Sequence, residues 1–171
     1  RSIYNSMTSR LLVDKIEGKA SSGTVAMPSG SVIQVVQGTR FGSNDITSTS
    51  FVATDLSVDI TPKFSTSKIL VTCTFCSDLG AGSRQIFATI YRDSTRLDTQ
   101  TSLGGNASSA GFHTNYSTAR IIFDGSMQFL DAPASSSQIT YKMYALSSNG
   151  STVTVNAQSI LNRIVAEEIA G

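Results

Sequence analysis

Apolar residues recur at every second position in one segment of this chain after another, and this spacing constrains the fold more than any other feature. The pattern is clear in KILVTCTFCSDL, where Ile69, Val71 and Cys73 fall on one side and Thr72 and Thr74 on the other. Side chains two residues apart share one face of a β-strand, whereas a helix needs spacings of three and four. The chain is therefore predicted to be all-β.

The same spacing predicts strands in several further segments, namely 31–37, 56–61, 84–93 with a turn near Asp93-Ser94, and two strands around Asp124-Gly125 within 118–133. Segment 138–158 is predicted to be a β-hairpin, because Asn149-Gly150 suits a two-residue turn in which both positions take positive φ. Its first strand is apolar on both faces through Tyr144 and Leu146, so we expect one face to meet the core and the other a neighbouring subunit. The C-terminal SILNRIVAEEIAG also fits one side of a helix, but we predict a strand.

A series of strands at this spacing, with no strong helix between them, indicates an antiparallel jelly-roll sandwich of about eight to ten strands. We assign this domain to residues 31–171 and an extended N-terminal arm to residues 1–30. The arm carries a small apolar cluster that is predicted to dock on a neighbouring subunit or another protein: Leu11, Leu12, Val13 and Ile16. The exposed edges of a sandwich invite pairing, and a closed three-fold assembly would cover them.

Charge and hydropathy argue against two classes of partner. The formal net charge is +1, only 15% of residues are charged, and no basic cluster stands out, so nucleic acid is not an expected partner. No apolar run approaches the roughly 20 residues that cross a bilayer, so membrane insertion is not expected.

The residues that could support chemistry are few. His113 is the single histidine and has no acidic neighbour in sequence, and Cys73 and Cys76 should point to opposite faces of a strand as buried side chains. These residues cannot supply the four converging ligands of a zinc site, although oxygen ligands within 42–46 leave a structural calcium open. Glu167 and Glu168 should also face opposite ways. We expect no enzyme activity, no cofactor and no metal.

A long loop, TSLGGNASSAGFHTNY (101–116), interrupts the strands, and loops of this length often serve binding. Together with the loop 78–84 it offers aromatic rings that stack on sugars and amides that bond their hydroxyls. The predicted receptor-binding residues are Phe112, His113, Tyr116, Asn106, Asn115 and Arg84.

Three stretches carry a resemblance to a known group of proteins: LLVDKIEGKASSGTVAMPSGSVIQVVQGT, TSFVATDLSVDITPKFSTSKILVTCTF and VTVNAQSILNRIVAEEIA. In this order they resemble virion proteins that are common in phages of aquatic bacteria. The resemblance implies a tumour-necrosis-factor-like jelly roll that assembles as a homotrimer on the virion, beside other tail or capsid proteins.

Two functions remain open at this point. The first is a trimeric fibre or tail-tip module for host attachment, which contacts a cell-surface glycan or protein. The second is a capsid decoration (cement) trimer that stabilises the head and is fastened by the arm. We favour attachment, because the resemblance is commonest among fibre proteins.

Overall fold

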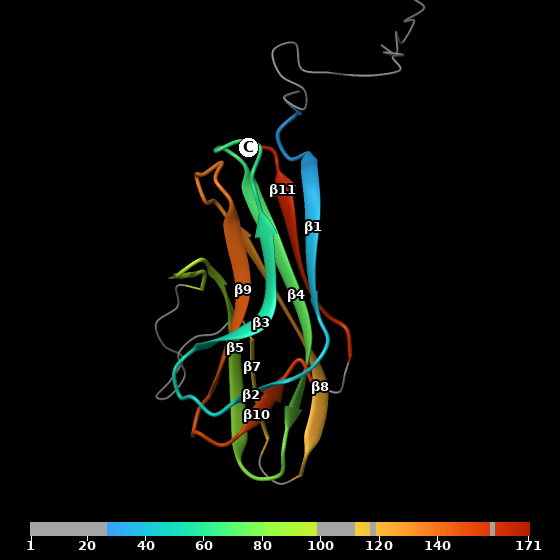
Figure 1. The fold of residues 1–171 in the computed structure, drawn as a ribbon, viewed down its shortest axis with the longest axis vertical. Coiled ribbons are helices and arrows are strands. Elements are labelled where there is room, and N and C mark those ends of the chain that lie inside the picture. Colours follow the sequence, from blue (N-terminus) through green and yellow to red (C-terminus); the bar gives the residue numbers. More distant parts are fainter. Residues whose placement is uncertain (1–26, 99–111, 117–118, 158–159) are drawn as a thin grey trace, which may run out of the picture.

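A computed structural model describes residues 27–98, 112–116, 119–157 and 160–171, so the predicted arm lies almost entirely outside the described residues. The described part contains no helix, and therefore no helix that could cross a membrane. It forms eleven strands (Figure 1): β1 (Val32–Arg40), β2 (Asn44–Ile46), β3 (Val52–Ile60), β4 (Lys68–Leu79), β5 (Arg84–Arg92), β6 (Thr95–Arg96), β7 (Phe112–Tyr116), β8 (Ile121–Asp131), β9 (Ile139–Ser147), β10 (Val153–Val155) and β11 (Asn162–Ile169).

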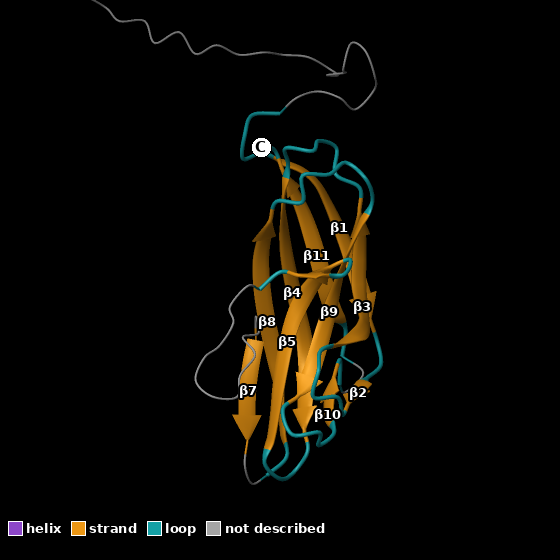
Figure 2. Ribbon diagram, turned by 90° about the vertical axis from the view of Figure 1, so that its left-hand side faces the viewer, coloured by secondary structure: helices purple, strands orange, loops and turns teal. Residues whose placement is uncertain are grey.

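The strands build two antiparallel sheets that lie one behind the other (Figure 2). Sheet I has the order β1-β11-β4-β10-β2, and β8 pairs with the remaining edge of β4. Sheet II has the order β3-β9-β5-β6, and β7 also pairs with β5. The long strands thus follow the orders β1-β11-β4-β8 and β3-β9-β5-β7, which is the connection of a jelly roll. The predicted fold class is confirmed.

The core lies between the two sheets and consists of the inward residues of each strand. In β4, Ile69, Val71 and Cys73 are fully buried, as the alternation predicts. From sheet II, Tyr141 is also fully buried, and its hydroxyl donates a hydrogen bond of 2.7 Å to Asp131. The strand predicted at the C-terminus is confirmed as β11, whose Ile164 faces the same core.

The hairpin predicted around Asn149-Gly150 is wrong. Strand β9 pairs with β3 and β5 in sheet II, whereas β10 pairs with β2 and β4 in sheet I, so residues 148–152 cross from one sheet to the other. Gly150 has a φ of 77°, but Asn149 is not among the residues with positive φ, as the two-residue turn would require. The Asn149 side chain instead holds the crossing: its amide donates to the Ser83 carbonyl at 2.7 Å and its oxygen accepts from the Ser151 N–H at 3.1 Å.

The turn predicted at Asp124-Gly125 is also wrong, because β8 is one continuous strand that pairs with β4 along its whole length. Gly125 lies opposite Phe75, and a Cβ built on Gly125 would lie 2.6 Å from the Phe75 ring. Glycine is therefore needed here because it leaves room for a core side chain of the neighbouring strand. The turn predicted near Asp93 is confirmed between β5 and β6, where Asp93 has a φ of 51°.

The sandwich has two distinct ends (Figure 1). At the end that we call the base, the described chain enters near Met27 and finishes at Gly171. At the opposite end, the tip, the β4–β5 loop (80–83) lies beside the crossing 148–152, to which the Asn149 side chain ties it. Any contact made through the tip is thus made far from the point where the chain enters.

Candidate functional site

The residues predicted to line a binding loop do not lie in one. Phe112–Tyr116 form strand β7, which pairs with β5 so that His113 lies opposite Phe87 and Asn115 opposite Gln85. The alternation within FHTNY was hidden by the Gly/Ser-rich sequence before it. Asn106 lies outside the described residues, as do Leu11, Leu12, Val13 and Ile16 of the predicted docking arm.

Arg84, the remaining predicted receptor contact, serves the architecture of the tip. Its guanidinium donates hydrogen bonds to the carbonyl of Ala81, at 3.1 Å, and to the carbonyl of Thr152. These bonds tie the β4–β5 loop to the crossing between the sheets. Arg84 therefore helps to shape the tip.

A polar cleft lies at the tip beside Arg84. It has a volume of about 330 Å³ and is lined by Ser83, Gln85, Ser148 and Asn149. All four side chains are uncharged, and all of them carry hydroxyl or amide groups. Sequence reasoning pointed to the loop 78–84 but missed Gln85, Ser148 and Asn149, because nothing in their local pattern shows that two sheets meet there.

The outer face of sheet II is covered by the chain's own side chains. The Tyr91 and Tyr144 rings stack with centroids 3.9 Å apart, and the Phe51 ring meets Tyr91 edge-on at 6.4 Å. The Arg96 guanidinium lies 4.8 Å from the centre of the Phe51 ring and forms an ion pair with Asp98. The ring faces are thus largely engaged within the molecule.

This covering corrects the expectation for the second apolar face of β9. Leu146 is 5% exposed and its register neighbour Phe87 is 3% exposed, although both occupy outward positions of sheet II. Tyr144 stacks on Tyr91 of the same chain. These residues are satisfied without a neighbouring subunit.

The outer face of sheet I, in contrast, is open. The pairing register places Val35, Glu167, Leu70 and Leu130 in one row across β1, β11, β4 and β8. Val35 and Leu130 are each 57% exposed, and Ile122, further along β8, is 45% exposed. The next row holds one more aliphatic side chain, Val165, among neutral residues.

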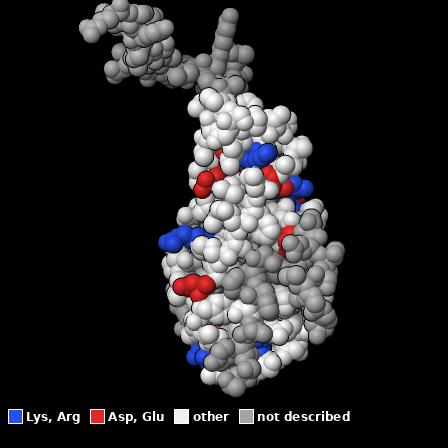
Figure 3. All heavy atoms as spheres, turned by 180° about the vertical axis from the view of Figure 1, so that it is seen from behind, with Lys and Arg blue, Asp and Glu red and all other residues white. Residues whose placement is uncertain are grey.

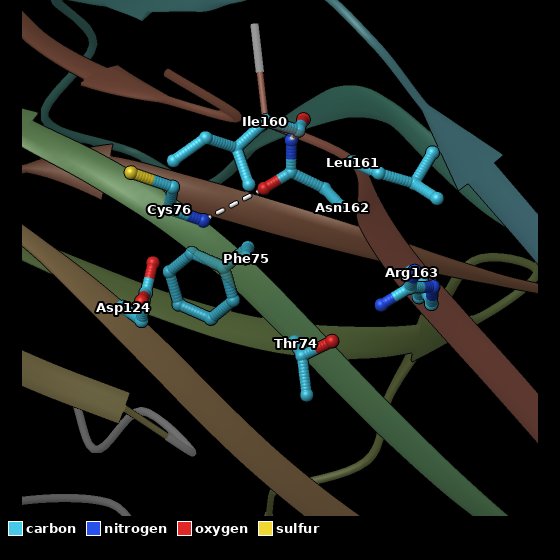
Figure 4. A pocket seen from close by; sticks show the side chains of 8 residues that line it. All are labelled: Thr74, Phe75, Cys76, Asp124, Ile160, Leu161, Asn162 and Arg163. Carbon is cyan, nitrogen blue, oxygen red and sulfur yellow. Dashed lines mark hydrogen bonds between the residues drawn. The ribbon is translucent and has the colours of Figure 1, made fainter. Parts of the chain in front are cut away.

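A second hollow, of about 250 Å³, lies where β4 exchanges one partner for another (Figure 4). Strand β11 pairs with β4 as far as Thr74, and β10 takes over from Ser77. In the gap, the Asn162 side-chain oxygen accepts a hydrogen bond of 2.7 Å from the Cys76 N–H and completes the ladder. Asp124 and the Cys76 thiol lie at the wall of this hollow (Figure 4).

The two thiols are poor nucleophiles in this environment. Burial raises the pKa of Cys73 from its ordinary value of 9.0 to about 12. Burial also raises the pKa of Cys76, and the neighbouring Asp124 carboxylate raises it further. Both side chains are buried in β4 on opposite faces, as the sequence predicts, and both thiols stay protonated near neutral pH.

The acidic side chains belong to the framework. Glu168 is fully buried and accepts hydrogen bonds from the Gln34 amide at 2.6 Å and from the Lys63 and Phe64 N–H groups at 2.7 and 3.3 Å. Glu167 faces the opposite side of the sheet, as expected. The described residues contain no group of three or more His, Cys, Asp or Glu that could hold a metal ion.

The acidic and amide side chains of segment 42–46, where a structural calcium was left open, also bond to protein groups. The Asn44 amide donates to the Asp55 carboxylate at 3.0 Å, and the Asp45 carboxylate accepts from the Thr154 hydroxyl at 2.7 Å.

Among the described residues visible from behind, Lys, Arg, Asp and Glu form no large patch (Figure 3). They are scattered among uncharged residues, in keeping with 13 basic and 12 acidic residues in the whole sequence.

No protein-family model and no curated protein matches the chain. Among solved structures, it is similar to a chain in the structure of infectious bursal disease virus, Gx strain, with 13% sequence identity and a TM-score of 0.38. The match covers 96% of this chain and 43% of the viral chain, so this chain spans less than half the length of its structural neighbour.

Proposed function

We propose that this chain is a non-enzymatic structural module of a bacteriophage virion, that it assembles as a homotrimer through the open face of sheet I, and that it takes part in host attachment. The observation that carries the proposal is the contrast between the open face of sheet I and the covered face of sheet II. The sequence resemblance to phage virion proteins supplies the setting.

The open face has the composition of a contact surface. Val35, Leu70 and Leu130 lie in one row, and burying apolar area is worth about 25 cal/mol per Å². Glu167 stands in the same row, so the neighbouring copy has to offer its carboxylate a hydrogen-bond donor or a cation. Each copy in a closed ring would bury such a face against its neighbours.

The titratable side chains support a structural role. Asp131 accepts two hydrogen bonds from Arg92, at 2.8 and 2.9 Å, and one from Tyr141. Glu168 is occupied by three donors, and both thiols have raised pKa values. These groups hold the sandwich together.

The positions of the two chain ends favour attachment. The chain enters and finishes at the base, which leaves the loops of the tip free to meet another surface (Figure 1). A module mounted by its base on a fibre or tail would point its tip outward.

A capsid decoration trimer is the second candidate, and one observation favours it. At the base, a hollow of about 110 Å³ is lined by Met27, Phe64, Thr66, Ala170 and Gly171, and Met27 is 49% exposed. A cement protein would use such a base to grip a capsid. The position of the protein on an imaged virus particle separates the two candidates.

The assembly is tested by light scattering on the purified full chain. We expect a trimer, and we expect Val35→Glu with Leu130→Glu to give a folded monomer, because both side chains are more than half exposed. Val52→Glu, on an exposed valine of β3 in sheet II, is the matched control and should remain trimeric. A monomeric wild type would refute the assembly, and a trimeric double variant would refute the assigned face.

Attachment is tested by fluorescent labelling of host cells with the wild-type trimer. Labelling is the expected result. If the assembled trimer fails to label the host of the virus that carries it, the decoration alternative takes precedence.

A further inference from the structure

We infer that the cleft at the tip, between the β4–β5 loop and the crossing 148–152, is a binding site for an uncharged saccharide. The inference rests on the proposed attachment function and deepens it by naming the site and the ligand class. It replaces the aromatic loop expected from the sequence.

The size and composition of the cleft fit a small polyhydroxylated ligand. Its volume of about 330 Å³ lies at the lower end of the roughly 300–1,000 Å³ typical of small-molecule sites. The lining residues are Ser83, Gln85, Ser148 and Asn149, whose side chains offer hydroxyl and amide groups. Such groups both donate and accept hydrogen bonds, as sugar hydroxyls do.

Some of these groups are free to bind. The Gln85 amide and the Ser83 and Ser148 hydroxyls make no hydrogen bond to another group within the part of the chain that the structure describes.

The absence of charge among the lining residues selects the class of sugar. A carboxylated or sulfated saccharide would call for a cation, and no charged residue among the described ones lines the cleft. The guanidinium of Arg84, the nearest cation in sequence, donates to the Ala81 and Thr152 carbonyls. Neutral hexoses and N-acetylhexosamines need no such partner. The cleft therefore favours uncharged sugars over anionic ones.

The cleft is held in shape before any ligand arrives. Asn149 bonds the Ser83 carbonyl at 2.7 Å, and the Ser148 N–H donates to the Gln85 carbonyl at 3.2 Å. Because these bonds join the two loops, binding orders little further backbone and costs little entropy. A single water-exposed cleft of this kind binds weakly, and three copies in one assembly would raise the apparent affinity through multivalency.

The test is ligand-observed NMR on the full-length chain with two panels of probes. One panel contains glucose, galactose, mannose and N-acetylglucosamine, and the other contains sialic acid and a sulfated hexose. We expect saturation transfer to at least one neutral sugar and none to the anionic sugars. Gln85→Ala with Ser148→Ala should weaken binding by about tenfold or more, the loss of one to two hydrogen bonds. Gln138→Ala, an exposed glutamine outside the cleft, is the matched control and should bind as the wild type does.

Three outcomes overturn the inference: no neutral sugar binds at tens of millimolar, only the anionic panel binds, or the double variant binds as well as the wild type. The melting temperature and oligomeric state of each variant show whether it is folded. If wild type and double variant label host cells equally, the cleft is refuted while attachment stands. If neither neutral sugars nor cells are bound, both proposals fall together.

Discussion

The outer faces of the two sheets both carry apolar side chains, but they differ in how far the rest of the chain covers them. On sheet II, the outward Phe87, Thr89 and Leu146 are 3%, 0% and 5% exposed. The stacked rings of Tyr91 and Tyr144 lie on the same face. On sheet I, the outward Val35 and Leu130 are each 57% exposed. Alternation in a sequence thus shows which strand faces are apolar, but not whether the same chain covers them.

The largest expected effect is on the pH dependence of the unfolding free energy. It compares Cys73, on the inner side of sheet I, with Cys76, on the outer side. The pKa of the core-facing Cys73 is raised from 9.0 to about 12, so the unfolded chain loses this proton at lower pH than the folded one. The stabilising effect is fully present below pH 9 and is lost as the pH rises toward 12, by about 1.4 kcal/mol per pH unit. Urea unfolding between pH 8 and roughly 11 measures this slope.

Cys73→Ala should reduce that slope, whereas Cys76→Ala, on the opposite side of the same strand, should reduce it less. Tyr141, whose pKa is also raised by burial, continues to contribute in both variants. An equal slope in wild type and Cys73→Ala would contradict the assignment of Cys73 to a sealed core.

The second effect compares the two outer faces directly. Tyr144→Ala removes the stack on Tyr91 and uncovers sheet II, which should cost about 3 kcal/mol of unfolding free energy. Leu130→Ala on the open face should change it by no more than about 0.5 kcal/mol in the monomer. Urea unfolding of both variants measures the difference, in the background of Val35→Glu and at low protein concentration. Equal losses of unfolding free energy would contradict the distinction between the two faces.

The third effect uses two adjacent glutamates of β11. Glu168→Gln should cost about 2 kcal/mol, because an amide N–H₂ cannot accept from all of Gln34, Lys63 and Phe64. Glu167→Gln, on the open face, should cost less than about 0.5 kcal/mol. Thermal unfolding by calorimetry at neutral pH compares them, and a costly Glu167→Gln would indicate that the outer face is more engaged than the monomer shows.

Much of the fold was predictable, because period-two alternation is local and strong in β1, β4 and β11. The errors arose where a strand that is distant in sequence determines the local conformation. Gly125 resembles a turn residue in the sequence. In the structure, the Phe75 ring from a strand some fifty positions earlier fills the space that a side chain at Gly125 would need. Asn149-Gly150 resembles a hairpin turn in the sequence. In the structure, β9 pairs with β5 in sheet II and β10 pairs with β4 in sheet I.

The candidate site was predictable only in part. The loop 78–84 was identified, but residues 78 and 79 belong to β4 and Arg84 begins β5, where its guanidinium donates to two backbone carbonyls. Gln85 and Ser148 come together only because two sheets converge at the tip, and no spacing along the chain records that convergence. A strand of five residues at 112–116 escaped notice because its alternation is too short to stand out.

The divided edge of β4 has a mechanical consequence. Strand β11 fastens residues 68–74 and β10 fastens residues 77–79, so the two ends of sheet I are closed by separate sets of backbone bonds. Local opening can therefore release the three-residue pairings of β10 and β2 while the seam with β11 stays shut. Amide hydrogen exchange should accordingly be faster at Thr154 than at Val165. The tip can then adapt to a contacting surface while the sheet near the base keeps its shape.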